Sequence, residues 1–236
     1  MFVLSGSVEP DDANQWRLYA DQGRGYAIAF DPTASMVALA DDSVDPPPTE
    51  RVGFARYRDL VDVTPWLHVL YLHDEVNQAL DESTAALTKQ IDAVEQNAGS
   101  AEERDEGFEH LRSSAYDRLA MVAHLIKGPG FAGEHEVRVV TTFTLNSDHI
   151  KYRPSDHGLV GYVTLTGAPA KSGSNRVRWP NAGHSGASQV LGLPVTAVRL
   201  GPLLPEEHTN TVHGFLRKNG LQDVLIERST VPLRSP

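Results

Sequence analysis

The sequence predicts an α+β protein with a central, mostly antiparallel sheet and an inserted antiparallel pair of helices. Short apolar runs bounded by glycine and proline are typical of strands. Long stretches of good helix formers occupy the middle of the chain. Strands and helices are interleaved without the regular alternation of a doubly wound sheet, and this order favours α+β. We expect a single domain over residues 1–236, with the helical insertion at about 66–126.

The first part of the chain predicts two strands with a short helix between them. The strands are expected at Phe2 to Gly6 and at Tyr26 to Phe30. Asp11 or Asp12 is the predicted N-cap of the helix, and Gly23-Arg24-Gly25 ends it. The inward face of this helix is expected to carry Trp16, Tyr19 and Ala20.

Two long helices are predicted in the middle of the chain. The first runs from Trp66 to Ala98 and the second from about Glu106 to Ile126, with a polar turn over Asn97 to Asp105. Short connections favour an antiparallel pair. The apolar stripe of the first helix is Leu67, Leu70, Val76, Leu80, Leu87, Ile91 and Val94, and that of the second is Phe108, Leu111, Ala115, Leu119, Val122 and Ile126.

The other segments predict strands, loops and a last helix. The loops are the Pro46-Pro47-Pro48 stretch and residues 168–188, which are rich in glycine, serine, asparagine and proline. The remaining predicted elements are strands around Ala55-Arg56-Tyr57 and at Glu136 to Phe143, Leu159 to Leu165, Val195 to Leu200 and Val224 to Glu227, and a helix at Pro205 to Lys218.

Composition restricts the possible partners. The formal net charge is −10, from 21 Lys and Arg against 31 Asp and Glu, so duplex nucleic acid is not expected as a partner. The absence of cysteine excludes disulfides and thiolate chemistry and fits a cytoplasmic location. The N-terminal residues lack a signal peptide pattern, and no segment is long and apolar enough to predict a membrane span.

The segment from Glu134 to Val140 is the most informative for function. In a strand, side chains alternate between faces, so Glu134, Glu136 and Arg138 would share one face. Two carboxylates beside a cation can acquire different pKa values and different roles, and this predicts a catalytic pair. The alternative is an edge strand with a solvated, charged face and an ordinary ion pair.

Further candidate binding residues come from other segments. Ser5 and Ser7 would point to one side of the first strand and could bind a ribose or an amide, although so short a motif more often marks a strand end entering a loop. Lys127 could bring an ammonium to the glutamates, or it could simply belong to a helix terminus. The aromatic–basic set Trp16, Arg17 and Tyr19 could stack on a planar ligand, although aromatics three residues apart usually form core.

Metal binding is not predicted. The histidine pairs His68 and His73, and His208 and His213, are five residues apart rather than the four that place two ligands on one helix face. The Gly183-His184-Ser185-Gly186 segment lies in a predicted loop, without the strand and helix that a nucleophile elbow requires.

Several motifs together resemble the bacterial family called domain of unknown function 2971. The order of the motifs, from about Phe2 to Arg234, carries this resemblance. They are Ser5-Gly6-Ser7, Gln15 to Tyr19, Gly23 to Asp31, Lys127, Phe131, Glu134 to Arg138, Tyr162-Val163, Gly201-Pro202, Phe215-Leu216, Ser229 and Pro232 to Arg234. Members usually carry a further region before the serine motif, whereas this sequence starts at the serine strand.

A more distant likeness is to ADP-ribosyltransferases with an Arg, Ser, Glu-x-Glu set. Ser5 and Ser7 match the serine strand, and Glu134 and Glu136 match the glutamate motif. The likeness implies NAD as substrate, with Glu136 holding the nicotinamide ribose and stabilising an oxocarbenium-like transition state, Glu134 orienting the acceptor and the serines bracing the ribose. The arginine of that set has no counterpart in this sequence.

Two hypotheses follow for function. The first is an NAD-binding, ADP-ribosyltransferase-like protein in which Ser5, Ser7, Glu134 and Glu136 converge, with a small molecule as ligand. The second is a non-catalytic binding or regulatory domain in which Glu134, Glu136 and Arg138 form a structural charge network. A protein partner is not identified by the sequence.

Overall fold

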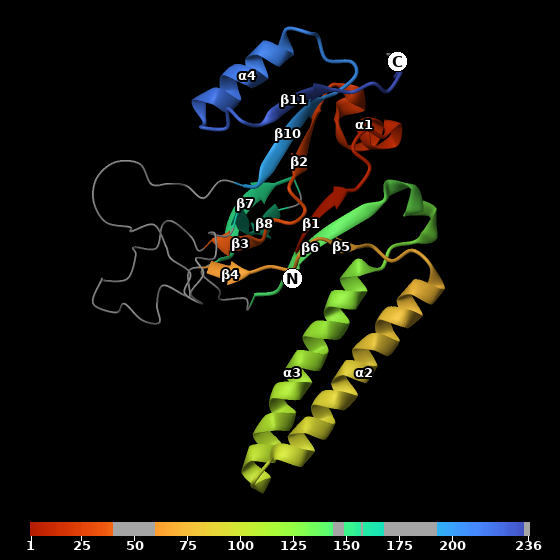
Figure 1. Ribbon diagram of the computed structural model, residues 1–236, viewed down its shortest axis with the longest axis vertical. Helices are drawn as coiled ribbons and strands as arrows, with labels where there is room; N and C mark the ends of the chain where they lie inside the picture. Colours follow the sequence, from red (N-terminus) through yellow and green to blue (C-terminus); the bar gives the residue numbers. More distant parts are fainter. Residues whose placement is uncertain (40–59, 144–148, 157, 168–192, 234–236) are drawn as a thin grey trace, which may run out of the picture. The chain divides into compact units, whose positions relative to one another are not determined.

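The computed structural model describes residues 1–39, 60–143, 149–156, 158–167 and 193–233. The chain divides into two compact units. The first comprises Met1, Val3–Val8 and Trp66–Thr142, and the second comprises Phe2, Glu9–Pro65 and Phe143–Pro236. Helices and small, mostly antiparallel sheets both contribute (Figure 1), and the predicted α+β class is confirmed.

The sheet of the first unit has the strand order β1 (Phe2–Ser7), β6 (Glu136–Thr141), β5 (Leu67–His68). β6 is therefore the central strand, and β5 runs antiparallel to it. Five of the six residues of β6 are buried, as expected for a strand covered on both faces. The interpretation of the glutamate segment as an edge strand is thus wrong, because β1 and β5 flank it on either side.

The two long helices of the first unit are α2 (His73–Asn97) and α3 (Ala101–Leu125). The predicted pair is confirmed, but both helices begin elsewhere than expected. α2 begins later because Leu67–His68 pairs with β6 as a strand. α3 begins earlier because the Ser100 side chain caps it, accepting a hydrogen bond from the Glu103 N–H at 3.1 Å. A Cβ on Gly107 would lie 2.7 Å from Val94 Cγ1, so this glycine permits the close approach of the helices.

Among its described residues, the second unit contains two three-stranded sheets and a hairpin. In one sheet, β10 (Val195–Leu200) is antiparallel to β2 (Tyr26–Phe30) and parallel to β11 (Leu225–Arg228). In the other, β3 (Met36–Leu39) lies between β4 (Leu60–Asp62) and β9 (Thr164–Gly167). The hairpin pairs β7 (Lys151–Ser155) with β8 (Gly158–Tyr162).

Short helices complete the two units. The second unit has α1 (Ala13–Tyr19), η1 (Asp21–Gly23) and α4 (His208–Lys218), and the first has η4 (Pro129–Glu134). Each unit has its own buried apolar residues. These are Val69, Val122, Val137, Val139 and Val140 in the first, and Trp16, Met36, Val37, Ala38, Ala197, Val198, Leu200, Leu204 and Leu216 in the second.

Several predictions for the second unit are corrected. Tyr19 was expected to face inward but is 66% exposed, and Trp16 is the one buried residue of α1. Leu159 to Leu165 is not one strand but parts of β8 and β9, which pair with different partners. β3 and β7 were not predicted. The Pro46-Pro47-Pro48 loop, the strand around Ala55-Arg56-Tyr57, the loop at 168–188 and the Gly183-His184-Ser185-Gly186 segment lie outside the described residues.

The two glycine motifs of the second unit pack on each other. Gly23 has a φ of 93°, which favours glycine. The N–H of Gly201 donates to the Gly25 carbonyl at 3.0 Å, and the N–H of Leu203 donates to the Gly23 carbonyl at 3.0 Å. A Cβ on Gly201 would lie against the Gly23 carbonyl oxygen. The Gly23-Arg24-Gly25 turn and Gly201-Pro202 thus form one structural joint.

Candidate functional site

The glutamates lie where the 3-10 helix η4 enters β6. Glu134 is the last residue of η4, and Glu136 is the first of β6. His135 between them has a φ of 46°, in the left-handed region. The predicted strand alternation therefore fails at Glu134, because a left-handed residue separates it from the strand. Glu136 and Arg138 do lie on one strand with the spacing expected for a shared face.

The end of β1 holds this turn. The Ser7 hydroxyl donates to the Glu134 carbonyl at 2.8 Å, and the Val8 N–H donates to the His135 carbonyl at 3.1 Å. From the other side, the Glu136 N–H donates to the Tyr71 hydroxyl oxygen at 3.0 Å. Two segments distant in sequence thereby position both glutamates.

Two cations bind the two carboxylates. Lys127 Nζ lies 2.6 Å from Glu134 Oε2 and 2.9 Å from Glu136 Oε2. Arg138 Nε lies 2.9 Å from Glu136 Oε1, and Arg138 Nη2 lies 3.1 Å from Glu136 Oε2. The side chains are between 8% and 21% exposed, so these ion pairs are shielded more than surface pairs are. We call these four residues, together with Ser5, the Glu136 cluster.

The backbone of Lys127 is anchored before its side chain reaches the acids. Its N–H donates to the Leu70 carbonyl at 3.0 Å, and the Leu70 N–H donates to the Leu125 carbonyl at 2.7 Å. The ammonium also lies 4.9 Å from the centre of the Phe131 ring, within cation–π range. Lys127 is therefore fixed at the exit of α3 rather than free in solvent.

Hydrogen bonding keeps Glu136 and Lys127 charged. Burial would raise the pKa of Glu136, but hydrogen bonds from Arg138, Ser5 and Lys127 outweigh it and lower the pKa to about 2. Burial would lower the pKa of Lys127, but its hydrogen bonds to Glu134 and Glu136 raise it to about 12. Glu136 is thus a permanent anion near neutral pH, suited to accepting hydrogen bonds rather than to donating a proton.

The structure brings together six of the predicted site residues and places the other three in the second unit. Ser5, Ser7, Lys127, Glu134, Glu136 and Arg138 all belong to the first unit and are linked by the contacts above. In the second unit, Trp16 is buried and donates its indole N–H to Asp11 Oδ1 at 2.7 Å. Arg17 and Tyr19 are exposed.

The sequence did not predict that Tyr71 and His124 contact the cluster. The Tyr71 hydroxyl accepts a hydrogen bond from the Glu136 N–H, and the His124 carbonyl near the end of α3 accepts one from Arg138 Nη1. Neither interaction has a local sequence signal, because each joins segments that are distant in the chain.

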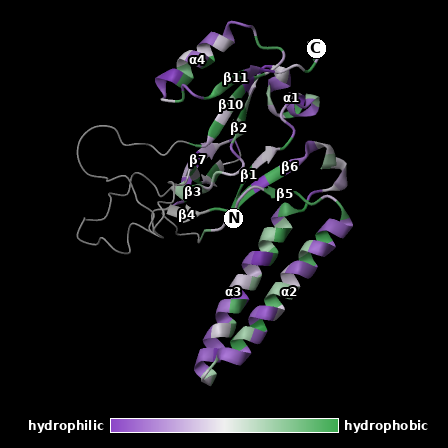
Figure 2. Ribbon diagram, in the orientation of Figure 1, coloured by the Kyte–Doolittle hydropathy of each residue, from purple (hydrophilic) through white to green (hydrophobic). Residues whose placement is uncertain are grey.

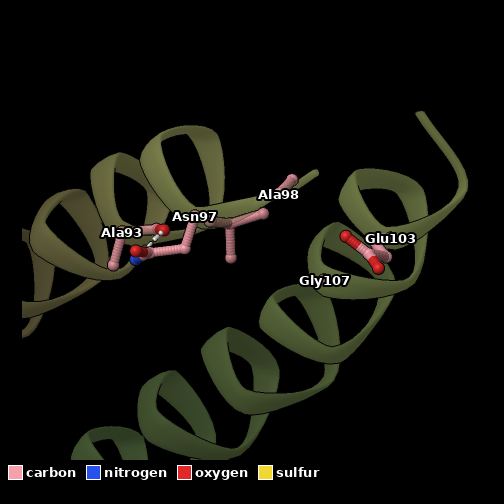
Figure 3. A pocket seen from close by; sticks show the side chains of 6 residues that line it. Ala93, Asn97, Ala98, Glu103 and Gly107 are labelled. Atoms are coloured by element: carbon pink, nitrogen blue, oxygen red, sulfur yellow. Dashed lines mark hydrogen bonds between the residues drawn. The ribbon is translucent and has the colours of Figure 1, made fainter. Parts of the chain in front are cut away.

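Within the described residues, a pocket lies away from the Glu136 cluster. It has a volume of about 310 Å³ and lies between α2 and α3 near their connecting turn (Figure 3). Its lining is Ala93, Val94, Asn97, Ala98, Glu103 and Gly107. Within the described ranges, no group of three or more His, Asp or Glu side chains has a geometry suited to holding a metal ion. Among the helices described, none has the length and apolarity needed to cross a bilayer.

Comparison with known families identifies the chain. The model of a protein of unknown function (DUF2971) matches residues 15–139, more than half of the 236 residues. The chain belongs to the DUF2971 family. The match includes Lys127, Glu134, Glu136 and Arg138 and begins after Ser5 and Ser7. Neither a curated protein nor a solved structure matches the chain.

Proposed function

We propose that this DUF2971 protein binds NAD at the Glu136 cluster and acts as an ADP-ribosyltransferase-like enzyme. The observation that carries the proposal is the hydrogen bond between Ser5 on β1 and the Glu136 carboxylate on the neighbouring strand. A serine hydroxyl beside a permanently ionised glutamate is the pair that the likeness to these transferases assigns to the ribose.

The hydrogen bonds of Glu136 indicate where a ligand enters. An ionised carboxylate offers about four acceptor sites. Arg138 fills two of them and Lys127 a third, and Ser5 is the remaining donor. Ser5 is exposed, whereas Lys127 and Arg138 are mostly covered. A ribose hydroxyl can therefore replace the Ser5 hydroxyl without disturbing either ion pair.

The chemistry assigned to the cluster is substitution at the ribose C1′ carbon. The bond from C1′ to the nicotinamide nitrogen breaks, and nicotinamide leaves with the electron pair. The acceptor's nucleophilic atom then forms a new bond to C1′ and loses its proton to solvent. Glu136 stabilises the positive charge that develops on the ribose, and Glu134 orients the acceptor.

A titration with NAD tests the proposal. We expect the wild-type chain to bind NAD by isothermal titration calorimetry and to release nicotinamide, detected by chromatography. Glu136→Gln keeps the side-chain shape but loses the charge, and it should lower nicotinamide release by about 100-fold or more. Glu227→Gln is the matched control because Glu227 pairs with Arg199 at 2.6 Å in the other unit, and it should leave both signals unchanged.

The proposal is abandoned if the wild-type chain neither binds NAD at about 1 mM, a concentration at the weak end of specific ligand affinity, nor releases nicotinamide. It also fails if Glu136→Gln and Glu227→Gln behave alike in both assays while circular dichroism shows that both fold.

A second candidate function is a non-catalytic binding or regulatory domain in which the cluster is a structural charge network. The observation in its favour is that two cations accompany the two carboxylates, so the four charges sum to zero. Lys127 and Arg138 both lie within hydrogen-bond distance of Glu136, and they weaken the stabilisation it can give to a positively charged transition state. In that case Glu136→Gln lowers the stability of the chain. NAD then changes neither the melting temperature of the variant nor that of the wild type.

A further inference from the structure

The segment that joins Lys127 to Glu134 combines small residues with one exposed aromatic ring. Phe131 is the largest side chain between these two ends, and it is 53% exposed. Hydrophilic residues stand at both ends, and small or apolar ones stand between them, where α3 leads into β6 (Figure 2). The Phe131 N–H donates to the Gly128 carbonyl at 3.0 Å, which fixes the backbone that carries the ring. The ring is therefore held toward solvent rather than in the core of the first unit.

Two neighbouring glycines keep space open beside the ring. Gly130 and Gly133 lie in the 3-10 helix η4, and neither has a positive φ. A Cβ at either position would meet no atom of the described residues within 4 Å. Alanine would thus fit the folded chain at both positions, and it would reduce the conformational entropy that glycine loses on folding. Glycines that the fold itself does not require indicate room for a group from outside the chain, because glycine lets a ligand approach the backbone closely.

Lys127 connects the Phe131 ring to the Glu136 cluster. Its Nζ lies over the ring, 4.9 Å from the ring centre, and the same atom lies 2.9 Å from Glu136 Oε2. The ammonium occupies one face of the ring, and about half of the residue is in contact with solvent. Offset stacking of a second flat group on such a ring is favourable. A ligand that reaches Glu136 therefore finds an aromatic surface beside the carboxylate.

We propose that Phe131 stacks on the nicotinamide ring of NAD and that Gly130 and Gly133 give this ring room to enter. The inference rests on the proposed function, in which Glu136 binds the ribose that carries nicotinamide. The nicotinamide nitrogen is bonded to C1′ of that ribose, so the nicotinamide ring has to lie close to the carboxylate. Stacking recognises its flat shape, and its positive charge in NAD adds a cation–π attraction to the phenyl face. The two carboxylates neutralise Lys127, so its ammonium opposes this attraction only weakly.

Calorimetric titrations of the full chain with NAD and with ADP-ribose test this proposal, because ADP-ribose has the same ribose without the nicotinamide. Phe131→Leu keeps an apolar side chain but loses the ring, and it should raise the dissociation constant for NAD by about 10-fold, as expected for the loss of one stacked pair. The dissociation constant of this variant for ADP-ribose should stay within about twofold of the wild-type value. Phe215→Leu is the matched control, since Phe215 is 64% exposed on α4 in the other unit, and it should change neither constant.

Gly133→Ala separates a role in binding from a role in folding. The added methyl group meets none of the described residues, so the melting temperature should equal or exceed that of the wild type. The methyl group occupies the space that we assign to nicotinamide, so the dissociation constant for NAD should rise by about 10-fold. Gly214→Ala on α4 is its control, because a Cβ there also meets nothing within 4 Å and lies in the other unit.

The proposal is overturned if the wild type binds NAD and Phe131→Leu binds it as tightly as Phe215→Leu does, and the proposed function then stands without this contact. It is also overturned if Phe131→Leu weakens ADP-ribose as much as NAD, since the ring then contacts another part of the ligand. A Gly133→Ala variant that melts earlier than the wild type and binds NAD normally has the same consequence, because the glycine then serves the fold. A wild type that binds neither NAD nor ADP-ribose overturns the proposed function together with this inference.

Discussion

Arg138 forms a two-point ion pair with Glu136 on the same strand, with Nε 2.9 Å from Oε1 and Nη2 3.1 Å from Oε2. The alternation of a strand brings residues two apart to one face, and the planar guanidinium matches the carboxylate. Lys127 then approaches the same carboxylate from outside the strand, 2.9 Å from Oε2. The Glu136 carboxylate is consequently oriented by an arginine of its own strand and by a lysine from outside the strand.

Removing the charge of Glu136 should destabilise the chain. In Glu136→Gln, Arg138 loses its counterion and Lys127 retains only Glu134. Losing one member of a mostly buried ion network costs about 2–4 kcal/mol. Urea denaturation followed by circular dichroism measures this loss. The exposed pair of Arg112 and Glu109, 2.7 Å apart, is the comparison, since Glu109→Gln should change stability by less than about 1 kcal/mol. Equal losses in the two variants would contradict the prediction.

The pH dependence of stability should follow the same cluster. The folded chain holds the pKa of Glu136 at about 2 against an ordinary 4.5, so the unfolded chain takes up this proton first as the pH falls. The stability that Glu136 contributes is therefore complete above pH 4.5 and is lost between 4.5 and about 2. The stability difference between wild type and Glu136→Gln should shrink over this window, and a difference independent of pH would contradict the assignment.

Lys127 should make the stability of the folded chain depend on pH in the alkaline range. Its pKa is raised from 10.5 to about 12 in the folded chain, so the unfolded chain loses this proton first as the pH rises. Its contribution is complete below pH 10.5 and is lost as the pH approaches about 12. Thermal melts of wild type and Lys127→Met between pH 9 and about pH 11.5 should converge as this contribution is lost. Parallel melting curves over that range would refute it.

The close approach of α2 and α3 at Gly107 should be testable by a pair of substitutions. Gly107→Ala gains about 1 kcal/mol of helix propensity, but its Cβ would lie 2.7 Å from Val94 Cγ1. Such overlap costs about 1–3 kcal/mol, so we expect a net loss of stability. Val94→Ala removes the overlapping atoms. The double variant should therefore be at least about 1 kcal/mol more stable than the sum of the single effects predicts, measured by urea denaturation. If the effects of the two substitutions on stability simply add, the added methyl group does not conflict with Val94 and the prediction is wrong.

A carboxylate joins the two ends of the second unit. Asp11 accepts hydrogen bonds from the indole of Trp16 at 2.7 Å, the hydroxyl of Ser229 at 2.6 Å and the N–H of Thr230 at 2.8 Å. Asp11→Asn replaces one acceptor oxygen by a donor and should cost about 1–3 kcal/mol. Asp12→Asn is the matched control, because Asp12 only caps α1 and asparagine caps equally well. A thermal melt in which both variants lose equal stability would argue against this role of Asp11.

Local signals in the sequence predicted several elements closely. The strand Tyr26–Phe30 and the strand Val195–Leu200 have the bounds expected from apolar runs that end at glycine or proline. Asp12 caps α1 as its residue type predicts. These features depend on neighbours within a few residues, and the backbone preferences of those residues are sufficient to set them.

Local signals were misleading where tertiary pairing competes with propensity. Leu67 fits the periodicity of a helix, yet it pairs with Arg138 as part of a strand. Glu134 fits the alternation of a strand, yet the left-handed His135 separates it from β6. Tyr19 fits an inward helical face, yet it is 66% exposed and Trp16 is the one buried residue of α1. Leu67 is decided by a partner far away in the chain, and Glu134 by the conformation of its neighbour His135, whose carbonyl accepts a hydrogen bond from the Val8 N–H.

The sequence by itself determined the α+β class, the two long helices, the acidic charge and the residue types of the Glu136 cluster, because composition and short-range periodicity carry this information. Only the tertiary structure decided that β6 is a central strand, that Ser5 meets Glu136 and that Lys127 bridges both acids. Ion pairs and hydrogen bonds act over a few ångströms in space and are insensitive to separation along the chain, so no local pattern specifies them.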